Sequence, residues 1–484
     1  MREDRRNLKE TLEHLLPEWS MDLLRSIQER TRASGKKVVV LDDDPTGTQT
    51  VHNVAVLTEW PLETLVAELR AGAPVFYLLT NSRSLPSAEA RALSQSIGSS
   101  LREASRRAGV EIAVISRSDS TLRGHFPGEV EALAESLQAG AEPFDAWLIV
   151  PFFIEGGRYT IDDVHYVAEG DVLVPAGQTE FARDKSFGYQ SSNLREWVAE
   201  KTGGSIPVGK VASISIEDLR AGGPEQVTRQ LLALPRGAVC VVNAASYRDL
   251  EVFVLGLLDA EARGKRYLYR TAASFVRVRA GIAPHPLLTA RDVLAPSPTN
   301  ERPAGLVVAG SYVPKTTAQL EALIQQLAVR PVEIQVERLL DKTSRADEIE
   351  RARGAVNEQL AAGRDTVLYT SRQLVSRDGA EQNLAIGAVV SESLVAVVQG
   401  LQTRPAYLLA KGGITSSDLA THGLGIRRAQ VLGQILPGVP VWQAGPESRY
   451  PGLPYIVFPG NVGGPDALVS IIRALRCMKR VKAP

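Results

Sequence analysis

Three consecutive aspartates, Asp42, Asp43 and Asp44, follow the apolar run 38–41. Adjacent carboxylates repel one another, so such a group needs a metal ion, a cationic neighbour or a hydroxyl-rich ligand to offset its charge. A short β-branched run without polar alternation is typical of a strand covered on both faces of a parallel sheet. The aspartates would then emerge at the carboxyl end of that strand, where open α/β sheets bind ligands. An acidic, solvated turn is the alternative interpretation.

Three arginines occur in polar runs that follow two later strands: Arg83 comes after the strand predicted at 75–79, and Arg117 and Arg123 come after the strand predicted at 111–115. Parallel strands end at one edge of a sheet, so these runs should converge on the aspartates. Arginine binds carboxylates through two directional hydrogen bonds, while aspartate accepts hydrogen bonds from hydroxyls. The pattern favours a site for a small hydroxy acid. In the alternative interpretation, the arginines only neutralise the aspartates. His125, which follows Gly124, could act as a base, but a lone histidine in this setting is more often structural.

Glycines follow three predicted strands in the second half of the chain, at 310, at 412–413 and at 460–464. Glycine lets the backbone approach phosphate oxygens, and a following helix presents free N–H groups. Three such loops in one sheet indicate a nucleotide site. Neither a Walker loop nor G-x-G-x-x-G is present, because the run 310–316 lacks the second glycine and one residue of spacing.

A rival hypothesis starts from the spacing of Asp42, Asp44 and Thr46 after an apolar strand. This spacing fits the haloacid dehalogenase-type phosphatases, in which the first aspartate is a nucleophile and the second an acid/base. That hypothesis leaves the glycine loops unexplained and lacks a convincing acidic pair on a later strand. A non-catalytic, nucleotide-regulated binding protein is a third interpretation.

The elements that position these residues alternate between strand and helix, which predicts an α/β fold of two doubly wound domains with mainly parallel sheets and a cleft between them. A proline-rich stretch at 283–303 separates the two series of strands. We therefore expect a helical arm at 1–35, a ligand-binding α/β domain at 36–290 and a second α/β domain at 291–484.

The composition of the 484 residues excludes several classes of protein. Lys plus Arg and Asp plus Glu number 55 each, so no basic excess indicates nucleic acid. Two cysteines, Cys240 and Cys477, make no disulfide framework, and Cys240 lies in an apolar run typical of a core. The N-terminus lacks the apolar segment of a signal peptide, and no run is long enough to span a membrane. The sequence predicts a cytoplasmic enzyme or binding protein.

Taken together, the motifs resemble those of the four-carbon acid sugar kinases from about residue 36 to the C-terminus. The residues that carry the resemblance are Asp43-Asp44-x-Thr46-Gly47, Asn81-Ser82-Arg83, Asp119-Ser120-Thr121-Leu122-Arg123-Gly124, Gly310-Ser311, Gly412-Gly413-x-Thr415 and Pro459-Gly460-Asn461. The family phosphorylates threonate, erythronate or related oxo acids with ATP. Its N-terminal domain holds the sugar acid and its C-terminal domain holds ATP.

The resemblance also implies roles for individual residues. The substrate contacts that it implies are Asp44, also the implied catalytic residue, Arg83, Arg117, Ser118, Asp119 and Ser120. The nucleotide contacts that it implies are Ser311, Gly412, Gly413, Ile414, Thr415 and Gly460. Mg²⁺ is expected with ATP, although no metal ligand is identified, and an oligomer is possible. An extra aspartate, Pro45 and His125 depart from the family's pattern beside the substrate. D-threonate is the substrate expected first, with erythronate and 3-oxo-tetronate as alternatives.

Overall fold

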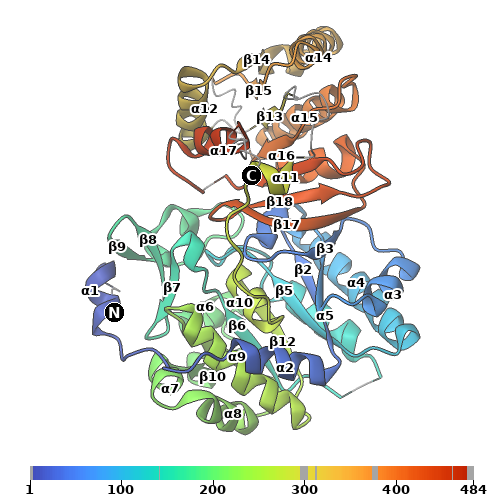
Figure 1. Cartoon of the computed structure of the whole chain (residues 1–484). Coiled ribbons are helices and arrows are strands. Elements are labelled where there is room, and N and C mark those ends of the chain that lie inside the picture. The colour runs from blue at the N-terminus through green and yellow to red at the C-terminus, as the bar shows by residue number, and fades with distance from the viewer. Residues whose placement is uncertain are drawn as a thin grey trace, which may run out of the picture. The chain divides into compact units, whose positions relative to one another are not determined.

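The computed structural model describes residues 4–140, 142–294, 304–310, 313–372, 380–460 and 462–476 (Figure 1). It divides the chain into two compact units. The first consists of Met1–Val51 and Glu59–Pro284, and the second of His52–Thr58 and His285–Pro484. The short segment His52–Thr58 therefore belongs to the second unit, although both of its sequence neighbours belong to the first.

A parallel sheet forms the centre of the first unit. In spatial order its strands are β10 (Val211–Ile214), β11 (Ala238–Val242), β6 (Ala146–Val150), β12 (Tyr267–Thr271), β5 (Ile112–Arg117), β2 (Lys37–Asp42) and β4 (Val75–Leu79). Every residue of β2 is buried, as expected for a strand covered on both faces. Asp42 is level with Arg117, and Arg117 with Thr271, so the carboxyl ends of β2, β5 and β12 lie side by side.

Helices follow most strands of this sheet, as the sequence pattern predicts. The helices of the first unit after the arm are α3 (Leu62–Arg70), α4 (Ser87–Ala108), α5 (Gly128–Gln138), α6 (Leu194–Lys201), α7 (Ile216–Arg220), α8 (Gly223–Ala233), α9 (Tyr247–Ala262) and α10 (Ala273–Arg279). Helix α4 packs against α3 and α5, and α8 packs against α9. Helix α9 begins with a capping box between Ser246 and Asp249, which satisfies the first free N–H groups of the helix.

The N-terminal arm, predicted to be helical, contains a strand as well as two helices. Helix α1 (Leu8–His14) has no buried residue, whereas α2 (Leu24–Ser34) packs against α9 and α10. The strand β1 (Arg6–Asn7) joins a small antiparallel sheet with β9 (Val172–Pro175), β8 (Val164–Glu169) and β7 (Arg158–Ile161). A two-residue turn, Asp162–Asp163, links β7 to β8 with φ values of 55° and 64°. Positive φ at both positions suits the twist of a tight hairpin.

The second unit has a mixed sheet. In spatial order its strands are β3 (Val54–Leu57), β17 (Arg428–Leu436), β18 (Val439–Ala444), β19 (Pro454–Phe458), β16 (Leu408–Lys411), β13 (Leu306–Ala309), β15 (Thr366–Thr370) and β14 (Arg330–Ile334). From β19 to β14 the strands are parallel, and β17 pairs antiparallel with both β3 and β18. The α/β fold class with mainly parallel sheets is confirmed.

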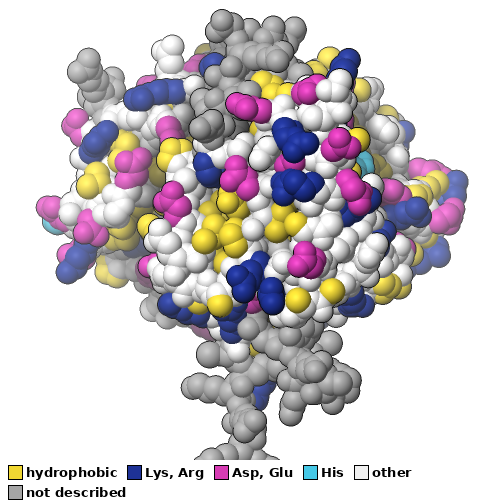
Figure 2. All heavy atoms as spheres, turned by 90° about the horizontal axis from the view of Figure 1, so that it is seen from above, with side chains coloured by type: hydrophobic (Ala, Val, Ile, Leu, Met, Phe, Trp, Pro, Cys, Tyr) yellow, Lys and Arg dark blue, Asp and Glu magenta, His cyan; other side chains and the backbone are white. Residues whose placement is uncertain are grey.

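The described helices of the second unit are α11 (Ala290–Val293), α12 (Pro314–Gln326), α13 (Val336–Leu340), α14 (Arg345–Ala361), α15 (Ala380–Gln399), α16 (Gly413–Asp418) and α17 (Ala467–Arg476). Across the described ranges, no helix combines the length and the apolar character that a membrane span requires. On the face shown in Figure 2, Lys and Arg side chains alternate with Asp and Glu. The even mixture on that face agrees with the formal net charge of zero.

Candidate active site

Backbone hydrogen bonds at the end of β2 tie the three aspartates to two neighbouring loops. The backbone N–H groups of Thr80 and Arg83 donate to the carbonyls of Asp42 and Asp43 over 2.9 and 3.4 Å. The N–H of Asp43 in turn donates to the carbonyl of Arg117 over 3.3 Å. The loops that follow β2, β4 and β5 therefore meet at one place, as the parallel order of these strands predicts.

Asp42, Asp43 and Arg117 form an inner cluster. The Arg117 guanidinium lies 3.0 Å from Asp42 Oδ1 and 3.7 Å from Asp43 Oδ1, and the three side chains are at most 4% exposed. A β-carbon at Gly47 would overlap the Asp42 carboxylate, so only glycine fits against it. Burial raises the pKa of Asp42 to about 7 and that of Asp43 to about 6, although Arg117 opposes both shifts. The closed position of Asp42 is unsuited to the nucleophile of the phosphatase hypothesis.

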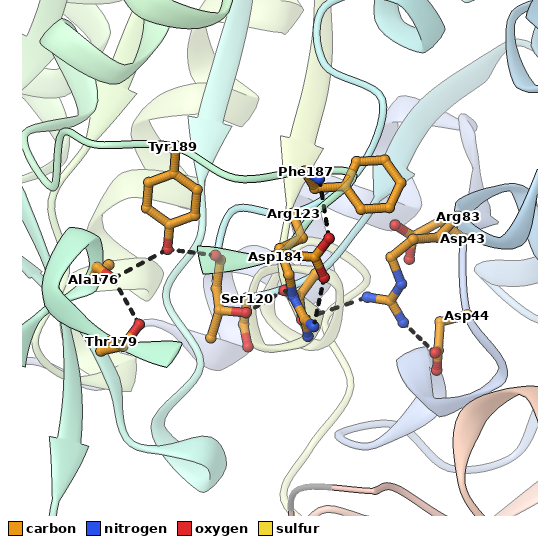
Figure 3. Close-up of polar contacts among 12 residues, drawn as sticks. Asp43, Asp44, Arg83, Ser120, Arg123, Ala176, Thr179, Asp184, Phe187 and Tyr189 are labelled. Atoms are coloured by element: carbon orange, nitrogen blue, oxygen red, sulfur yellow. Dashed lines mark hydrogen bonds and ion pairs between the residues drawn. The ribbon is translucent and has the colours of Figure 1, made fainter. Parts of the chain in front are cut away.

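Asp44, Arg83, Asp119 and Arg123 form an outer cluster, part of which Figure 3 shows. Arg83 donates to Asp44 through Nη2, and its Nη1 lies 3.5 Å from Asp119 Oδ1. Arg123 Nε donates to Asp119 Oδ2 over 2.7 Å. The side chains of Asp44 and Arg83 are 12% and 20% exposed, which is more than any member of the inner cluster. The outer cluster is therefore the more exposed of the two.

The pKa of Asp44 moves opposite to those of its two neighbours. Burial would raise it, but the Arg83 charge and the hydrogen bonds from Thr46 outweigh burial and lower the pKa of Asp44. Burial would also raise the pKa of Asp119, and the charges of Arg123 and Arg83 bring it well below its usual range. Asp44 is thus fully ionised at neutral pH, whereas Asp42 and Asp43 are poised to titrate there.

A buried histidine, His165, contacts the backbone of the loop 117–125. His165 Nε2 lies 2.7 Å from the carbonyl of Ser120, and its Nδ1 lies 2.9 Å from Thr160 Oγ1. Burial lowers the pKa of His165 to about 4, so the ring is neutral: its Nε2–H donates to the Ser120 carbonyl, and its Nδ1 accepts from the Thr160 hydroxyl. The sequence alone does not point to His165, because a lone histidine in a strand carries no spacing signal.

The predicted substrate residues fall into distinct places. Asp44, Arg83 and Asp119 come together in the outer cluster, whereas Arg117 belongs to the inner one. Ser118 and Ser120 are buried in the loop between them, and the Ser118 N–H donates to Thr271 over 2.9 Å. His125 lies 3.0 Å from the carbonyl of Leu85 and packs edge-on against Phe187, which agrees with a structural role.

In the second unit, the predicted glycine loops meet at the carboxyl ends of β13, β16 and β19. A β-carbon at Gly310 would stand 2.8 Å from Thr415 Oγ1, so the loops after β13 and β16 touch. Gly412 has a φ of 109°, which favours glycine, and its N–H donates to the carbonyl of Phe458 over 2.9 Å. Ile414 is 61% exposed beside them. Ser311, also predicted here, lies outside the described residues.

Lys411 joins two of these loops through a buried amine. Its Nζ donates to the carbonyls of Pro459 and Gly460 over 2.7 and 3.3 Å and lies 3.9 Å from the centre of the Phe458 ring. Burial lowers the pKa of Lys411 to about 7, and the nearby charge of Lys315 adds to the effect. The sequence alone gives Lys411 no role, because it stands at the end of an apolar run.

Neither unit offers a protein-built metal cage among the described side chains, since no group of three His, Cys, Asp or Glu residues there could hold an ion. Magnesium in nucleotide sites is held mainly by phosphate oxygens and water and needs no such cage.

Two models of protein families match the chain. Residues 38–279 match a sugar-binding N-terminal domain, and residues 306–468 match a nucleotide-binding C-terminal domain. The aspartate–arginine clusters lie within the first range and the described glycine loops within the second.

Curated relatives show modest identity. The D-erythronate kinase of Heliobacterium modesticaldum is 27% identical over 247 residues, and this alignment spans 50% of each chain. The 3-oxo-tetronate kinase of Pseudomonas savastanoi pv. phaseolicola is 25% identical over 454 residues, covering 89% of this chain and 92% of that protein. The 3-oxo-tetronate kinase of Burkholderia multivorans is 27% identical over 443 residues, with the same coverage of 89% and 92%.

Two solved structures share the fold. A Haemophilus influenzae protein matches with a TM-score of 0.60 and 18% identity, covering 90% of this chain and 100% of that one. A protein from Salmonella typhimurium LT2 matches with a TM-score of 0.64 and 18% identity, covering 91% of this chain and 99% of that one.

Proposed function

We propose a reaction for this chain, which belongs to the four-carbon acid sugar kinase family. In this reaction the protein uses ATP to phosphorylate the terminal hydroxyl of a four-carbon sugar acid. As a member of this family the chain is a phosphotransferase with an alcohol group as acceptor. The observation that carries the proposal is the contact of Asp44 with Arg83 and of Arg83 with Asp119 within the range that matches a sugar-binding domain. This arrangement offers a hydroxy acid both acceptors and donors.

In this proposal the sugar acid binds at the outer cluster and the loop 117–120. Arg83 donates to an acid oxygen, Asp44 accepts a hydrogen bond from the attacking hydroxyl, and the run Arg117 to Ser120 completes the contacts. Arg117 also keeps Asp42 and Asp43 balanced in charge, as its distances of 3.0 and 3.7 Å allow. The acid is therefore held by directional charge pairs, which suit a carboxylate better than a neutral sugar.

The reaction joins the hydroxyl oxygen to the γ-phosphorus of ATP while the bond from that phosphorus to the β–γ bridging oxygen breaks. The hydroxyl proton passes to Asp44 and then to solvent, and ADP leaves. A lowered pKa makes Asp44 a weak base, but the loose transition state of phosphoryl transfer depends more on positioning and charge than on basicity. Asp44 thus acts chiefly by orienting the hydroxyl.

The nucleotide is proposed to bind at Gly412–Thr415 and Gly460 in the second unit, with Ser311 as a further contact from the resemblance. Backbone N–H groups at glycine turns are suited to phosphate oxygens. Mg²⁺ would arrive with ATP and neutralise its phosphates.

D-threonate is the substrate that we propose first, with D-erythronate and 3-oxo-tetronate as the alternatives. The relatives described above are named for the latter two. By the resemblance, Pro45 and His125 depart from the family's pattern beside the substrate, so all three acids are compared in the test.

The test is ADP release from the full chain with ATP, Mg²⁺ and each of the three acids in turn, with phosphorus NMR of the product. We expect at least one acid to stimulate ADP release and to yield one phosphomonoester per ADP. If no four-carbon acid does so, the proposal is wrong. Phosphate release without ATP and a phosphoryl group on Asp42 would support the phosphatase hypothesis, and ATP binding without turnover would support a binding protein.

A further inference from the structure

Asp43 and Arg270 are two buried, oppositely charged side chains in the first unit that do not contact each other directly. Each residue is 4% exposed. Neither Asp43 oxygen accepts a hydrogen bond from a described residue, and Arg270 Nη1 donates to none. Arg270 Nη2 donates to the carbonyl of Arg123 over 3.1 Å. Buried polar atoms are nearly always satisfied, so such a pair indicates that a partner binds there.

Gly124 lies between the two charges. A β-carbon at this position would stand 3.3 Å from Asp43 Oδ2 and 3.3 Å from Arg270 Nη2. Its φ of 119° is one that residues with a side chain rarely adopt. The bare side of Gly124 therefore faces both a carboxylate and a guanidinium, and a side chain there would press against them.

The Arg270 guanidinium is held in place by two aromatic rings. It lies 5.4 Å from the centre of the Phe126 ring and 5.8 Å from that of Trp197. Burial lowers the pKa of Arg270, while the charges of Glu129, Asp43 and Asp119 favour its ionised form. Asp119 also contacts Arg83, so Arg270 belongs to the same electrostatic environment as the outer cluster. The Arg270 guanidinium is therefore a charged donor packed between two rings, and its Nη1 has no hydrogen-bond acceptor among the described residues.

The chemistry of the missing partner follows from these two groups. A guanidinium with a free N–H binds a carboxylate oxygen, and a carboxylate with free lone pairs binds a hydroxyl proton. A compound with a hydroxyl next to a carboxylate supplies an acceptor for Arg270 and a donor for Asp43. A fully ionised phosphate supplies acceptors alone and donates nothing to Asp43.

We propose that Arg270 and Asp43, on either side of Gly124, bind the carboxylate of the sugar acid and its neighbouring hydroxyl. This inference rests on the proposed function and adds Arg270 and Asp43 to the residues that contact the sugar acid. Arg83 then donates to another oxygen of the same acid, and Asp44 accepts from its attacking hydroxyl, as proposed above.

The test is calorimetric binding of D-threonate and D-erythronate to the full-length wild type and to Arg270→Lys. The matched control is Arg279→Lys, because Arg279 is also buried in this unit but pairs with Glu261 over 2.7 Å. Loss of one charge-assisted hydrogen bond should weaken acid binding about 10- to 100-fold in Arg270→Lys. Arg279→Lys should bind the acids within about twofold of wild type, and ATP affinity should be unchanged in both.

Binding of a four-carbon polyol, which lacks the carboxylate, shows whether the substitution only distorts the site. The polyol should bind wild type and Arg270→Lys with the same affinity. If Arg270→Lys fails to fold, Asp43→Asn takes its place and should weaken binding of both acids about tenfold.

Acid affinity equal to that of the Arg279→Lys control would overturn the inference and assign the position between Asp43 and Arg270 to water. A wild type that binds ATP but none of the four-carbon acids would overturn the proposed function itself, and this assignment with it. The two failures are therefore distinguishable.

Discussion

The two candidate sites handle charge in different ways. In the first unit, aspartates and arginines contact one another directly, and the pKa values of Asp42, Asp43 and Asp44 are set by burial against the arginines. In the second unit, glycine loops dominate, and one buried amine, that of Lys411, binds backbone carbonyls. Paired side chains fix the position of each ligand atom, whereas a glycine backbone recognises phosphate in general. The difference predicts that substitutions in the first site change the choice of acid, and those in the second change affinity for nucleotide.

Asp44→Asn should cause the largest loss. We expect kcat to fall by about 10²- to 10⁴-fold, because the amide neither takes the hydroxyl proton nor balances Arg83. ATP affinity should stay within about twofold, since Asp44 lies in the other unit. Steady-state kinetics and calorimetry check this, with the exposed hairpin residue Asp162→Asn as the control. Equal losses of kcat and ATP affinity would assign Asp44 a structural role.

Gly310→Ala should reduce nucleotide binding without changing acid binding. Its β-carbon would come 2.8 Å from Thr415 Oγ1 and 3.0 Å from Leu394, so Thr415 must move. We expect the KM for ATP to rise about tenfold and the KM for the acid to be unchanged. The control is Gly354→Ala in α14, where a β-carbon meets nothing within 4 Å. An unchanged KM for ATP in Gly310→Ala would remove Thr415 from the site.

Lys411→Met should change how stability depends on pH. Because burial lowers the pKa of Lys411 from 10.5 to about 7, the folded chain releases a proton that the unfolded chain still holds between these values. The contribution of Lys411 to the free energy of unfolding is therefore lost as pH falls from about 10 to 7. Lys411→Met should abolish this dependence of the free energy of unfolding on pH. Denaturant titrations at pH 7 and pH 9.5 should show a difference of about 1–3 kcal/mol in wild type relative to the variant. Parallel pH profiles for the two proteins would refute the shift.

His165→Gln should have the smallest effect. The pKa of the buried ring is lowered from 6.5 to about 4, so its contribution to stability is lost as pH falls through this range. The raised pKa values of Asp42 and Asp43 act in the opposite direction, because these groups take up protons in the folded state first. His165→Gln should reduce the loss of folding free energy between pH 7 and pH 5 by about 1 kcal/mol. Melting temperatures at pH 5 and pH 7 are the measurement, and a steeper acid loss in the variant would contradict it.

Much of the fold could be predicted because its strands are short, apolar and followed by polar loops. Strands β2, β4 and β5 are such runs, and their parallel order brings Asp44 and Arg83 into contact as expected. The separate antiparallel sheet and the β17–β18 hairpin were missed, since they depend on pairing between strands that a local pattern does not contain. The placement of His52–Thr58 in the second unit depends on tertiary pairing with β17, which a local pattern does not contain.

The residues missed in the sites share a physical cause. Lys411 and Arg270 lie at the ends of apolar strands, and their importance follows from the charges and carbonyls that the fold brings beside them. Gly47 is needed because the Asp42 carboxylate packs against it. A single sequence names such residues but not their neighbours, so burial and pairing remain invisible until the strands are assembled.

The most direct test of the account is a pair of calorimetric titrations, one with D-threonate and one with a non-hydrolysable ATP analogue. Both are carried out on wild type, Arg83→Lys and Gly310→Ala. The account predicts that Arg83→Lys weakens acid binding about 10- to 100-fold and leaves the nucleotide unaffected. Gly310→Ala should do the reverse. If either variant weakens both ligands equally, the assignment of acid to the first unit and nucleotide to the second is wrong.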